Sequence, residues 1–337
     1  MKNILVTGGA GFIGSNFINH ILEERDDYNI VNLDKLTYAG NLENLKSSEG
    51  KKNYHFIKGD ITNSELVNYI FEKYKIKRVI NFAAESHVDR SILGSGIFYR
   101  TNVIGTNVLL ETARRYEVEK FLQVSTDEVY GSLGKEGLFT EMTPLSANSP
   151  YSSSKAAADM MVQAFYHTYR MPVVITRCSN NYGPLQFPEK LIPLMITNAL
   201  NNKKLPVYGD GMNVRDWIYV IDHNKAIDLV FEKGKIGEVY NIGASNEMPN
   251  IEIIKLILKH LEKSEDLIEY VKDRPGHDRR YAIDSSKIQN ELGWKPEFTF
   301  DLAMDNTIKW YIENKSWWER IISGEYQKYY DSLYNNR

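Results

Sequence analysis

The sequence predicts an α/β fold in which a doubly wound parallel sheet of the Rossmann type carries a smaller, loop-rich C-terminal lobe. Short β-branched runs alternate with amphipathic segments through the first half of the chain, and a glycine-rich turn follows the first of those runs. The alternation weakens beyond residue 178, and 337 residues exceed the usual size of a single core. We therefore expect one domain over residues 1–178, to which later segments return, and a second lobe over residues 179–337.

Each expected element follows from its own residue pattern. The expected strands are short, apolar and rich in β-branched residues, and they cover residues 4–6, 30–33, 54–57, 78–82, 121–124 and 173–176. Apolar residues at helical spacing predict helices over 12–24, 64–73, 101–116 and 151–169. Clusters of Gly, Pro and Asn at 179–184 and 209–215 predict loops, and further helices are expected over 191–201 and 251–261.

The composition argues against several classes of protein. A net charge of -3 without a basic run does not fit a nucleic-acid partner. No apolar stretch approaches about 18 residues, so no membrane span is expected. The single cysteine, Cys178, cannot form an intrachain disulfide, which favours a reducing, cytoplasmic setting, and we interpret it as a small buried side chain rather than a catalytic thiol. The histidines are scattered singly, so no metal site is predicted.

A glycine-rich turn followed by a distant aspartate predicts a dinucleotide site. Gly8, Gly11 and Gly14 lie between the first expected strand and the first expected helix. Such glycines allow a tight turn and let a pyrophosphate approach the backbone N–H groups at the positive end of the helix. Asp34 follows the second strand, where a carboxylate accepts hydrogen bonds from the adenosine ribose and repels a 2′-phosphate. NAD is therefore favoured over NADP, although the lysine that follows Asp34 weakens the preference.

A tyrosine and a lysine at the start of a helix predict an oxidising centre. Tyr151 and Lys155 are four residues apart and therefore share one helix face. The same spacing recurs at four other places, but only Tyr151 opens a helix after the fifth strand, and parallel sheets carry chemistry at the carboxyl ends of their strands. Lys155 and an oxidised nicotinamide are both cations, and we expect them to lower the pKa of the phenol so that it acts as a base.

Two adjacent carboxylates at the end of the fifth strand add acid–base chemistry. Thr126 is placed to hydrogen-bond the reacting alcohol, and Asp127 and Glu128 follow it directly. Taken alone, such a pair is more often an exposed turn. Beside Tyr151 and Lys155, partial burial and mutual repulsion would raise one of the two pKa values and leave an acid next to a base.

These motifs together resemble those of a known family. The sequence closely resembles the extended short-chain dehydrogenase/reductase superfamily and, within it, the dTDP-glucose 4,6-dehydratase family, in residues 7–15, 33–41, 83–91, 125–130, 180–190 and 273–281. The Thr-Asp-Glu triplet is the specific part, because related epimerases and decarboxylases share the glycine loop and the Tyr/Lys pair but not the acid pair. Two departures are the glycine-rich segment 93–97 and Ser153, where Ala is commoner.

The resemblance implies a set of site residues. Catalysis is implied for Thr126, Asp127, Glu128, Tyr151 and Lys155. NAD contacts are implied, with the glycine loop, for Gly8, Gly11, Phe12, Ile13, Gly14, Asp34, Lys35, Leu36, Thr37, Asp60, Ile61, Ala83, Ala84, Glu85, Thr101, Tyr151, Lys155 and Asn181. Nucleotide-sugar contacts are implied for Ser86, Thr126, Asn180, Lys190, Leu191, Pro206, Val207, Tyr208, Arg215, Asn250, Asp273, Arg274, Pro275, Gly276 and His277.

The implied activity is an internal redox cycle with NAD as cofactor. A nucleotide-linked glucose would be oxidised at carbon 4, lose water across carbons 5 and 6, and be reduced at carbon 6, in deoxysugar biosynthesis of the dTDP-rhamnose type. A homodimer is implied, with the helices 101–116 and 151–169 as candidate interface elements. The alternatives are a sugar-nucleotide 4-epimerase or decarboxylase, a dehydratase of UDP- or CDP-glucose, and an NAD-binding protein without catalysis.

Overall fold

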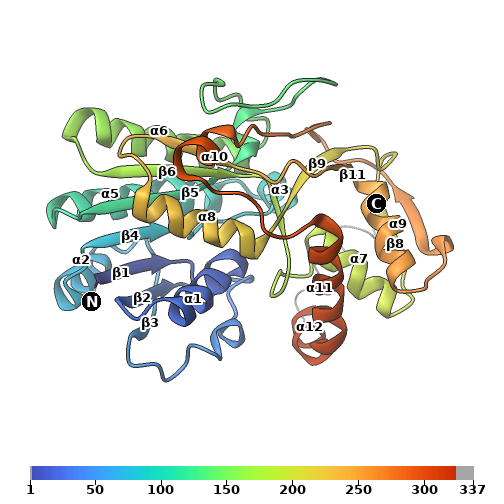
Figure 1. The fold of residues 1–337 in the computed structure, drawn as a ribbon, viewed down its shortest axis with the longest axis horizontal. Helices are drawn as coiled ribbons and strands as arrows, with labels where there is room; N and C mark the ends of the chain where they lie inside the picture. Colours follow the sequence, from blue (N-terminus) through green and yellow to red (C-terminus); the bar gives the residue numbers. More distant parts are fainter. Residues whose placement is uncertain (1, 324–337) are drawn as a thin grey trace.

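The computed structural model describes residues 2–323, and a seven-stranded parallel sheet lies at its centre (Figure 1). The strand order is β10-β6-β5-β4-β1-β2-β3, so the order reverses direction between β1 and β4. This confirms the predicted doubly wound sheet. The strands are β1 (Lys2–Thr7), β2 (Tyr28–Asp34), β3 (Tyr54–Lys58), β4 (Arg78–Asn81), β5 (Lys120–Thr126), β6 (Val173–Cys178) and β10 (Val239–Ile242).

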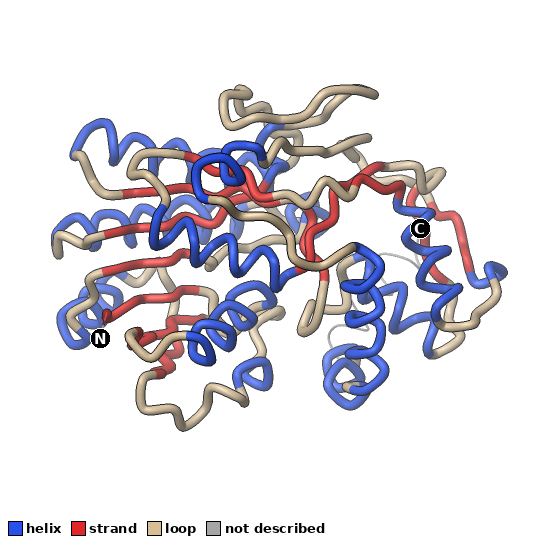
Figure 2. The backbone as a smooth tube through the Cα atoms, in the orientation of Figure 1, coloured by secondary structure: helices blue, strands red, loops and turns tan. Residues whose placement is uncertain are grey.

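Helices cover both faces of this sheet (Figures 1 and 2). One face packs against α1 (Phe12–Glu24), α8 (Val220–Lys233) and α10 (Ser286–Leu292), and the other against α2 (Ser64–Tyr74), α5 (Thr106–Arg115) and α6 (Pro150–Tyr169). Ile4 and Val6 of β1 belong to the core beneath α1, α8 and α10, and Leu5 belongs to the core beneath α2, α5 and α6. Both faces of β1 are therefore buried, which explains why its sequence is continuously apolar.

The helix expected over residues 101–116 has a different beginning. A short helix α3 (Val88–Leu93) leads into α4 (Gly96–Phe98), then into a π-helical segment η2 (Tyr99–Gly105), and only then into α5. At the end of the π-helical segment, a Cβ atom on Gly105 would lie 2.5 Å from the side chain of Ile61. This segment therefore approaches the loop after β3 closely, and it is a tertiary contact that helical periodicity does not reveal.

The second lobe is built from short strands and four helices. The strands are β7 (Asn180–Tyr182), β9 (Val214–Tyr219) and β11 (Glu247–Pro249) in one sheet, and β8 (Leu205–Tyr208) with β12 (Ile268–Val271) in another. Within the described residues its helices are α7 (Leu191–Leu200), α9 (Asn250–His260), α11 (Phe300–Glu313) and α12 (Lys315–Ile322), with a short 3-10 turn at η4 (Glu265–Leu267). Two further 3-10 turns, η1 (Leu42–Leu45) and η3 (Asp127–Tyr130), lie in the first domain. Because α8 and β10 return to the large sheet, no single residue separates the two parts.

The two tryptophans in the first half of α12 belong to the core of the second lobe. Trp318 is fully buried and donates its ring N–H to the backbone oxygen of Tyr311 at 2.8 Å. Trp317 donates to Asn44 in η1 at 3.0 Å, so the lobe is tied to the first domain. The aromatic tail beyond residue 323 lies outside the described residues. Within the described part of the chain, no helix has the length and apolar character needed to cross a membrane.

Candidate active site

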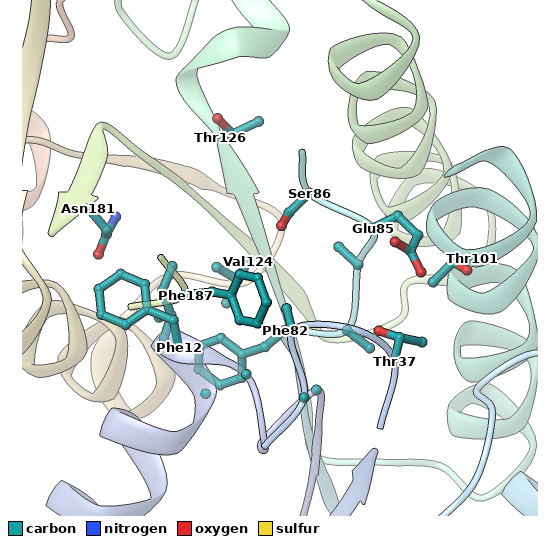
Figure 3. Close-up of a pocket in the computed structure, with 18 of the residues that line it drawn as sticks. Phe12, Thr37, Phe82, Glu85, Ser86, Thr101, Val124, Thr126, Asn181 and Phe187 are labelled. Carbon is teal, nitrogen blue, oxygen red and sulfur yellow. The ribbon is translucent and has the colours of Figure 1, made fainter. Parts of the chain in front are cut away.

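Two adjoining pockets lie where the carboxyl ends of the sheet strands meet the second lobe. The first pocket is lined by the ends of β1, β2, β4 and β5 and by the segment after β6. The second is lined mostly by residues of the second lobe and also by His87, Val88, Asp89 and Glu128 of the first domain. Glu128, Asn180, Glu189 and Lys190 line both pockets, so the two form one continuous site. In the first pocket, Phe12 and Phe187 lie on one side, Thr37 and Thr101 lie on the other, and Thr126 lies at one end (Figure 3).

The glycine turn forms a cradle that only glycine fits. Gly8 has a φ of +70°, and a Cβ atom there would lie 2.6 Å from the backbone nitrogen of Ala83. A Cβ atom on Gly14 would lie 2.5 Å from the carbonyl oxygen of Gly8. Helix α1 begins at Phe12 with Gly11 as its N-cap, and no side chain of the described residues caps it. Its first N–H groups therefore face the pocket, as a bound pyrophosphate requires, and the residues fit a dinucleotide.

Asp34 closes the adenosine end of the cradle. Its two carboxylate oxygens accept hydrogen bonds from the backbone nitrogens of Ala10 at 2.9 Å and Leu36 at 2.8 Å. These bonds hold the carboxylate at the end of β2. Lys35 follows Asp34, and we expected it to weaken the preference for NAD. Its ammonium group lies 2.8 Å from a carboxylate oxygen of Asp60. The negative charge of Asp34 therefore faces the ribose position, as selection of NAD over NADP requires.

Nearly all the predicted cofactor residues line the first pocket. They are Gly8, Gly11, Phe12, Ile13, Gly14, Asp34, Lys35, Thr37, Asp60, Ile61, Ala83, Ala84, Glu85, Thr101, Tyr151, Lys155 and Asn181. The exception is Leu36, whose side chain packs against the first core while its backbone nitrogen holds Asp34. A direct contact of Leu36 with NAD, implied by its place in the motif, stays a prediction, and its φ of +55° is that of a turn residue.

Three distant segments form a clasp beside the cofactor pocket, and the sequence did not predict it. We use "the clasp" for Tyr38, Arg90, Phe187 and Glu189. The guanidinium of Arg90 lies 3.7 Å from the centre of the Tyr38 ring and bonds a carboxylate oxygen of Glu189 at 3.0 Å. Tyr38 also meets Phe187 edge to face, with ring centres 5.5 Å apart. Since Phe187 and Glu189 line the pocket, the clasp fixes its wall.

The acid pair stands at the end of β5, in the short turn η3. The Thr126 hydroxyl accepts a hydrogen bond from the backbone nitrogen of Glu128 at 3.3 Å and thereby caps the turn. The same hydroxyl donates to a carboxylate oxygen of Asp127 at 3.3 Å. Asp127 is 2% exposed, and its other oxygen has no hydrogen-bond partner within residues 2–323. The pair is therefore not an exposed turn: Thr126, Asp127 and Glu128 all line the first pocket.

Both carboxyl groups have a raised pKa, but the charges around them differ. Burial raises the pKa of Asp127 well above its usual range, and the charges of Glu128 and Asp216 raise it further. Burial also raises the pKa of Glu128, but the cations of Arg274, Lys190 and others hold it down. Asp127 is therefore the group that keeps its proton and Glu128 the one that loses it, as an acid beside a base requires.

The tyrosine and lysine of α6 reach the same pocket, with one difference from expectation. Burial, and next the charge of Glu128, raise the pKa of Tyr151 well above its usual value. We expected Lys155 to lower that pKa, but its ammonium group donates to the backbone oxygen of Val124 at 2.7 Å, and burial lowers its own pKa. The Thr126 side chain is the neighbour that lowers the pKa of the phenol instead. In this structure burial therefore outweighs the effect of the lysine.

The second pocket gathers most of the predicted nucleotide-sugar residues. Lys190, Leu191, Pro206, Val207, Tyr208, Arg215, Asn250, Arg274, His277 and Asn180 line it, and Ser86 and Thr126 line the first pocket. Asp273, Pro275 and Gly276 line neither pocket. Asp273 instead forms a hydrogen bond of 2.6 Å with the ring of His277, and so it supports a residue that lines the second pocket.

Cationic side chains reach this second pocket from three segments. The ammonium group of Lys190 donates to the backbone oxygen of Ser86 at 3.0 Å. Arg215 donates to the backbone oxygen of Asp278 at 3.0 Å, with its guanidinium 4.4 Å from the centre of the Tyr281 ring. Arg274 lies 3.5 Å from a carboxylate oxygen of Asp89 and is mostly buried. Buried cations in such a pocket are typical of a site for an anion such as a diphosphate.

Several lining residues were not predicted. His87, Asp89, Trp217 and Tyr281 line the second pocket, and Gln186, Phe187 and Glu189 line the first. Most of these residues lie inside the motifs that carry the family resemblance. Their place in those motifs was the sequence signal that could have identified them as pocket residues. Trp217 lies in β9, outside every motif.

The cysteine also lies at the site. Burial, and next the charge of Asp127, raise the pKa of Cys178 to about 12. Its thiol donates to the backbone oxygen of Ser125 at 3.4 Å, so it is a neutral wall residue. Among residues 2–323, no group of three or more His, Cys, Asp and Glu side chains is arranged to hold a metal ion.

Comparison with known proteins places this site in a family. Residues 5–307 match the family described as GDP-mannose 4,6 dehydratase. A dTDP-glucose 4,6-dehydratase of Xanthomonas campestris pv. campestris (strain B100) is 52% identical, over 97% of this chain and 98% of the relative. A dTDP-glucose 4,6-dehydratase from Bacillus anthracis, solved with NAD, is 55% identical with a TM-score of 0.90, over 95% of this chain and 100% of that one. The Streptomyces venezuelae enzyme, also solved with NAD, is 46% identical with a TM-score of 0.92, over 95% and 99% of the two chains.

Proposed function

The chain belongs to the dTDP-glucose 4,6-dehydratase family, and from this premise we propose how its residues convert dTDP-glucose to dTDP-4-keto-6-deoxyglucose. The protein is an NAD-dependent lyase. When bound, NAD accepts a hydride from carbon 4 of the hexose and returns it to carbon 6, so the reaction has no net redox change. Every other step is proton transfer by side chains of this chain.

Each proton transfer has a candidate group in the pocket. Tyr151 takes the proton of the hydroxyl on carbon 4, with Lys155 beside it on α6. The new ketone acidifies the proton on carbon 5, which Glu128 removes. Asp127 gives its proton to the hydroxyl that leaves carbon 6, and Glu128 then returns its proton to carbon 5. Thr126 holds the carbon 4 hydroxyl.

The observation that carries this proposal is the unequal environment of the two adjacent acids, both of which have raised pKa values. Asp127 is buried next to like charges, and Glu128 faces the cations of Arg274 and Lys190. An epimerase or a decarboxylase on the same scaffold would use the tyrosine and the lysine but would give the two acids no task. The acid pair and the tyrosine line one pocket, which favours the dehydratase.

The test is to convert each acid to its amide. Asp127→Asn and Glu128→Gln should both retain NAD but lose formation of the 4-keto-6-deoxy sugar by roughly 10²–10⁴-fold, as expected for removal of one positioned acid or base. Glu128→Gln should also stop exchange of the carbon 5 hydrogen with solvent deuterium. Asp222→Asn is the matched control, because it removes a buried carboxyl that lines neither pocket. Normal ketone formation in either acid variant would refute its assigned role.

The same assay separates the alternative readings. Purified protein is incubated with dTDP-, UDP- and CDP-glucose, and the product is analysed for the sugar. A 4-keto-6-deoxy sugar from the dTDP substrate supports the proposal, and the same product from UDP- or CDP-glucose alone would reassign the nucleotide. A 4-epimer would support the epimerase. NAD binding without turnover of any substrate would support a non-catalytic protein.

We also propose a homodimer in a reducing, cytoplasmic setting. On the helices expected to form the interface, Ile104 is 54% exposed and Met160 is 62% exposed. Exposed apolar side chains on two neighbouring helices are consistent with a helix-to-helix contact between two copies of the chain. Ile104→Glu should therefore give a monomer in sedimentation, whereas Met142→Glu, at an 89% exposed position elsewhere, should not. A dimeric Ile104→Glu variant would contradict this interface.

A further inference from the structure

The groups assigned to the reaction lie on two different elements. Tyr151 and Lys155 lie on α6, whereas Asp127 and Glu128 lie in the turn η3. The proposed reaction needs both pairs around one hexose, because the ketone made at carbon 4 acidifies the proton on carbon 5. The position of η3 relative to α6 therefore decides whether oxidation is followed by loss of water.

A chain of buried side chains joins these two elements. We use "the brace" for Asp159 in α6, Arg177 in β6, Tyr130 at the end of η3 and Asn241 in β10. The guanidinium of Arg177 donates to a carboxylate oxygen of Asp159 at 2.9 Å and to the phenol oxygen of Tyr130 at 2.9 Å. The Tyr130 phenol donates to the side-chain oxygen of Asn241 at 2.8 Å. None of the four residues is more than 2% exposed.

The chemistry of the brace fixes the direction of each bond. A guanidinium has donors only, so the Tyr130 oxygen accepts from Arg177 and its own hydrogen is directed to Asn241. The amide nitrogen of Asn241 then donates to the backbone oxygen of Phe139 at 3.1 Å. The ring of Tyr130 also stacks on that of Phe139, with ring centres 5.1 Å apart. The last side chain of η3 is therefore held through its hydroxyl as well as through its ring.

The two ends of the brace differ in their other support. Helix α6 has 20 residues, and Lys155 ties it to β5 by donating to the backbone oxygen of Val124 at 2.7 Å. The turn η3 has four residues. It is held by the cap from Thr126 and by a hydrogen bond from the backbone nitrogen of Ser146 to the backbone oxygen of Val129 at 3.0 Å. Loss of the brace should therefore displace the acid pair and leave the tyrosine of α6 in place.

We propose that Arg177 is a positioning residue that holds the acid pair in place for the loss of water. It acts through Tyr130, because Arg177 and Tyr130 line neither pocket. Its effect falls on the removal of the carbon 5 proton and the departure of the carbon 6 hydroxyl, and the oxidation at carbon 4 does not depend on it. This role rests on the proposed function and adds a residue that the reaction scheme does not contain.

The test removes one hydroxyl from the brace and compares two steps of a single turnover. Tyr130→Phe keeps the ring but loses the bonds to Arg177 and Asn241. After rapid mixing with dTDP-glucose, the absorbance of bound NADH reports oxidation at carbon 4, and acid quench reports the 4-keto-6-deoxy sugar. NADH should form at the wild-type rate. The sugar product should form roughly 10–10²-fold more slowly, as expected when a reacting group is displaced by about 1 Å, so bound NADH should accumulate.

Tyr240→Phe is the matched control. Tyr240 precedes Asn241 in β10, is fully buried, and has a hydroxyl that donates to Glu291 at 3.0 Å and accepts from the backbone nitrogen of Lys235 at 3.1 Å. Its loss removes as many hydrogen bonds as Tyr130→Phe does, but none of them reaches η3 or α6. Both steps should therefore keep their wild-type rates in this variant.

A second substitution covers the case in which Tyr130→Phe does not fold. Arg177→Lys keeps a cation beside Asp159 but lacks the planar fork that also reaches Tyr130, so it should give the same separation of the two steps. The proposal is overturned if the variants slow both steps equally or neither step, or if Tyr240→Phe shows the same separation. Failure of the proposed function would look different, because the wild-type enzyme would then form no 4-keto-6-deoxy sugar.

Discussion

Replacing Gly8 with alanine tests the cofactor cradle most sharply. The backbone of Gly8 has a φ of +70°, and the new Cβ atom would lie 2.6 to 2.9 Å from backbone atoms of Phe82 and Ala83. A left-handed conformation costs an alanine about 1–2 kcal/mol. Forcing a methyl group against backbone adds about 1–3 kcal/mol. Together, Gly8→Ala should lower the free energy of unfolding by about 2–5 kcal/mol.

Gly50→Ala is the matched control. Gly50 has a φ of +78°, but a Cβ atom there would meet nothing within 4 Å. This variant should lose only the conformational cost of about 1–2 kcal/mol and should bind NAD as the unmodified protein does. Urea denaturation measures the stability of both variants, and isothermal titration calorimetry measures NAD binding. Equal destabilisation in the two variants, with NAD binding intact in Gly8→Ala, would refute the proposed clash between β1 and β4.

Three further predictions address the clasp, the acid pair and the core of the second lobe. Arg90→Met should increase the rate of NAD release at least about tenfold, because a tenfold change corresponds to about 1.4 kcal/mol and breaking a buried ion pair costs more. The control Arg25→Met, at the other end of the sheet, should leave the rate of NAD release unchanged. The rate of formation of the 4-keto-6-deoxy sugar should fall as the pH drops through the raised pKa of Glu128, because Glu128 must be ionised. It should also fall as the pH rises through the raised pKa of Asp127, because Asp127 must be protonated. A rate that does not change over either pH range would contradict the assignment. Trp318→Ala should lower the free energy of unfolding by about 3–5 kcal/mol in denaturation curves, and a loss below about 1 kcal/mol would contradict its place in the core.

The elements that the sequence predicted well are those with local causes. The first strand, the glycine turn and α1 follow one another within a few residues, and each has its own signal in composition or periodicity. The start of the helix after residue 98 could not be predicted in this way, because helical periodicity does not distinguish the π-helical segment from the α-helix that follows it. The return of α8 and β10 to the large sheet likewise depends on packing between segments far apart in the chain.

The same distinction holds at the site. The positions of Tyr151 and the acid pair at strand and helix ends could be predicted, because parallel sheets gather such residues at one edge. The clasp could not, since Arg90 and Glu189 are far apart in sequence and each alone looks like a surface charge. The lowering of the phenol pKa by Lys155 and an oxidised nicotinamide stays a prediction, whereas the burial of Tyr151 and the bond of Lys155 to Val124 become visible only in three dimensions.

The central claim is that one hexose passes through oxidation, loss of water and reduction within a single pocket. The direct measurement uses dTDP-glucose with deuterium at carbon 4 and follows the label by mass spectrometry and NMR. The account predicts that the deuterium appears at carbon 6 of the 4-keto-6-deoxy product of the same molecule. Deuterium that stays at carbon 4, or that is lost to solvent, would contradict it.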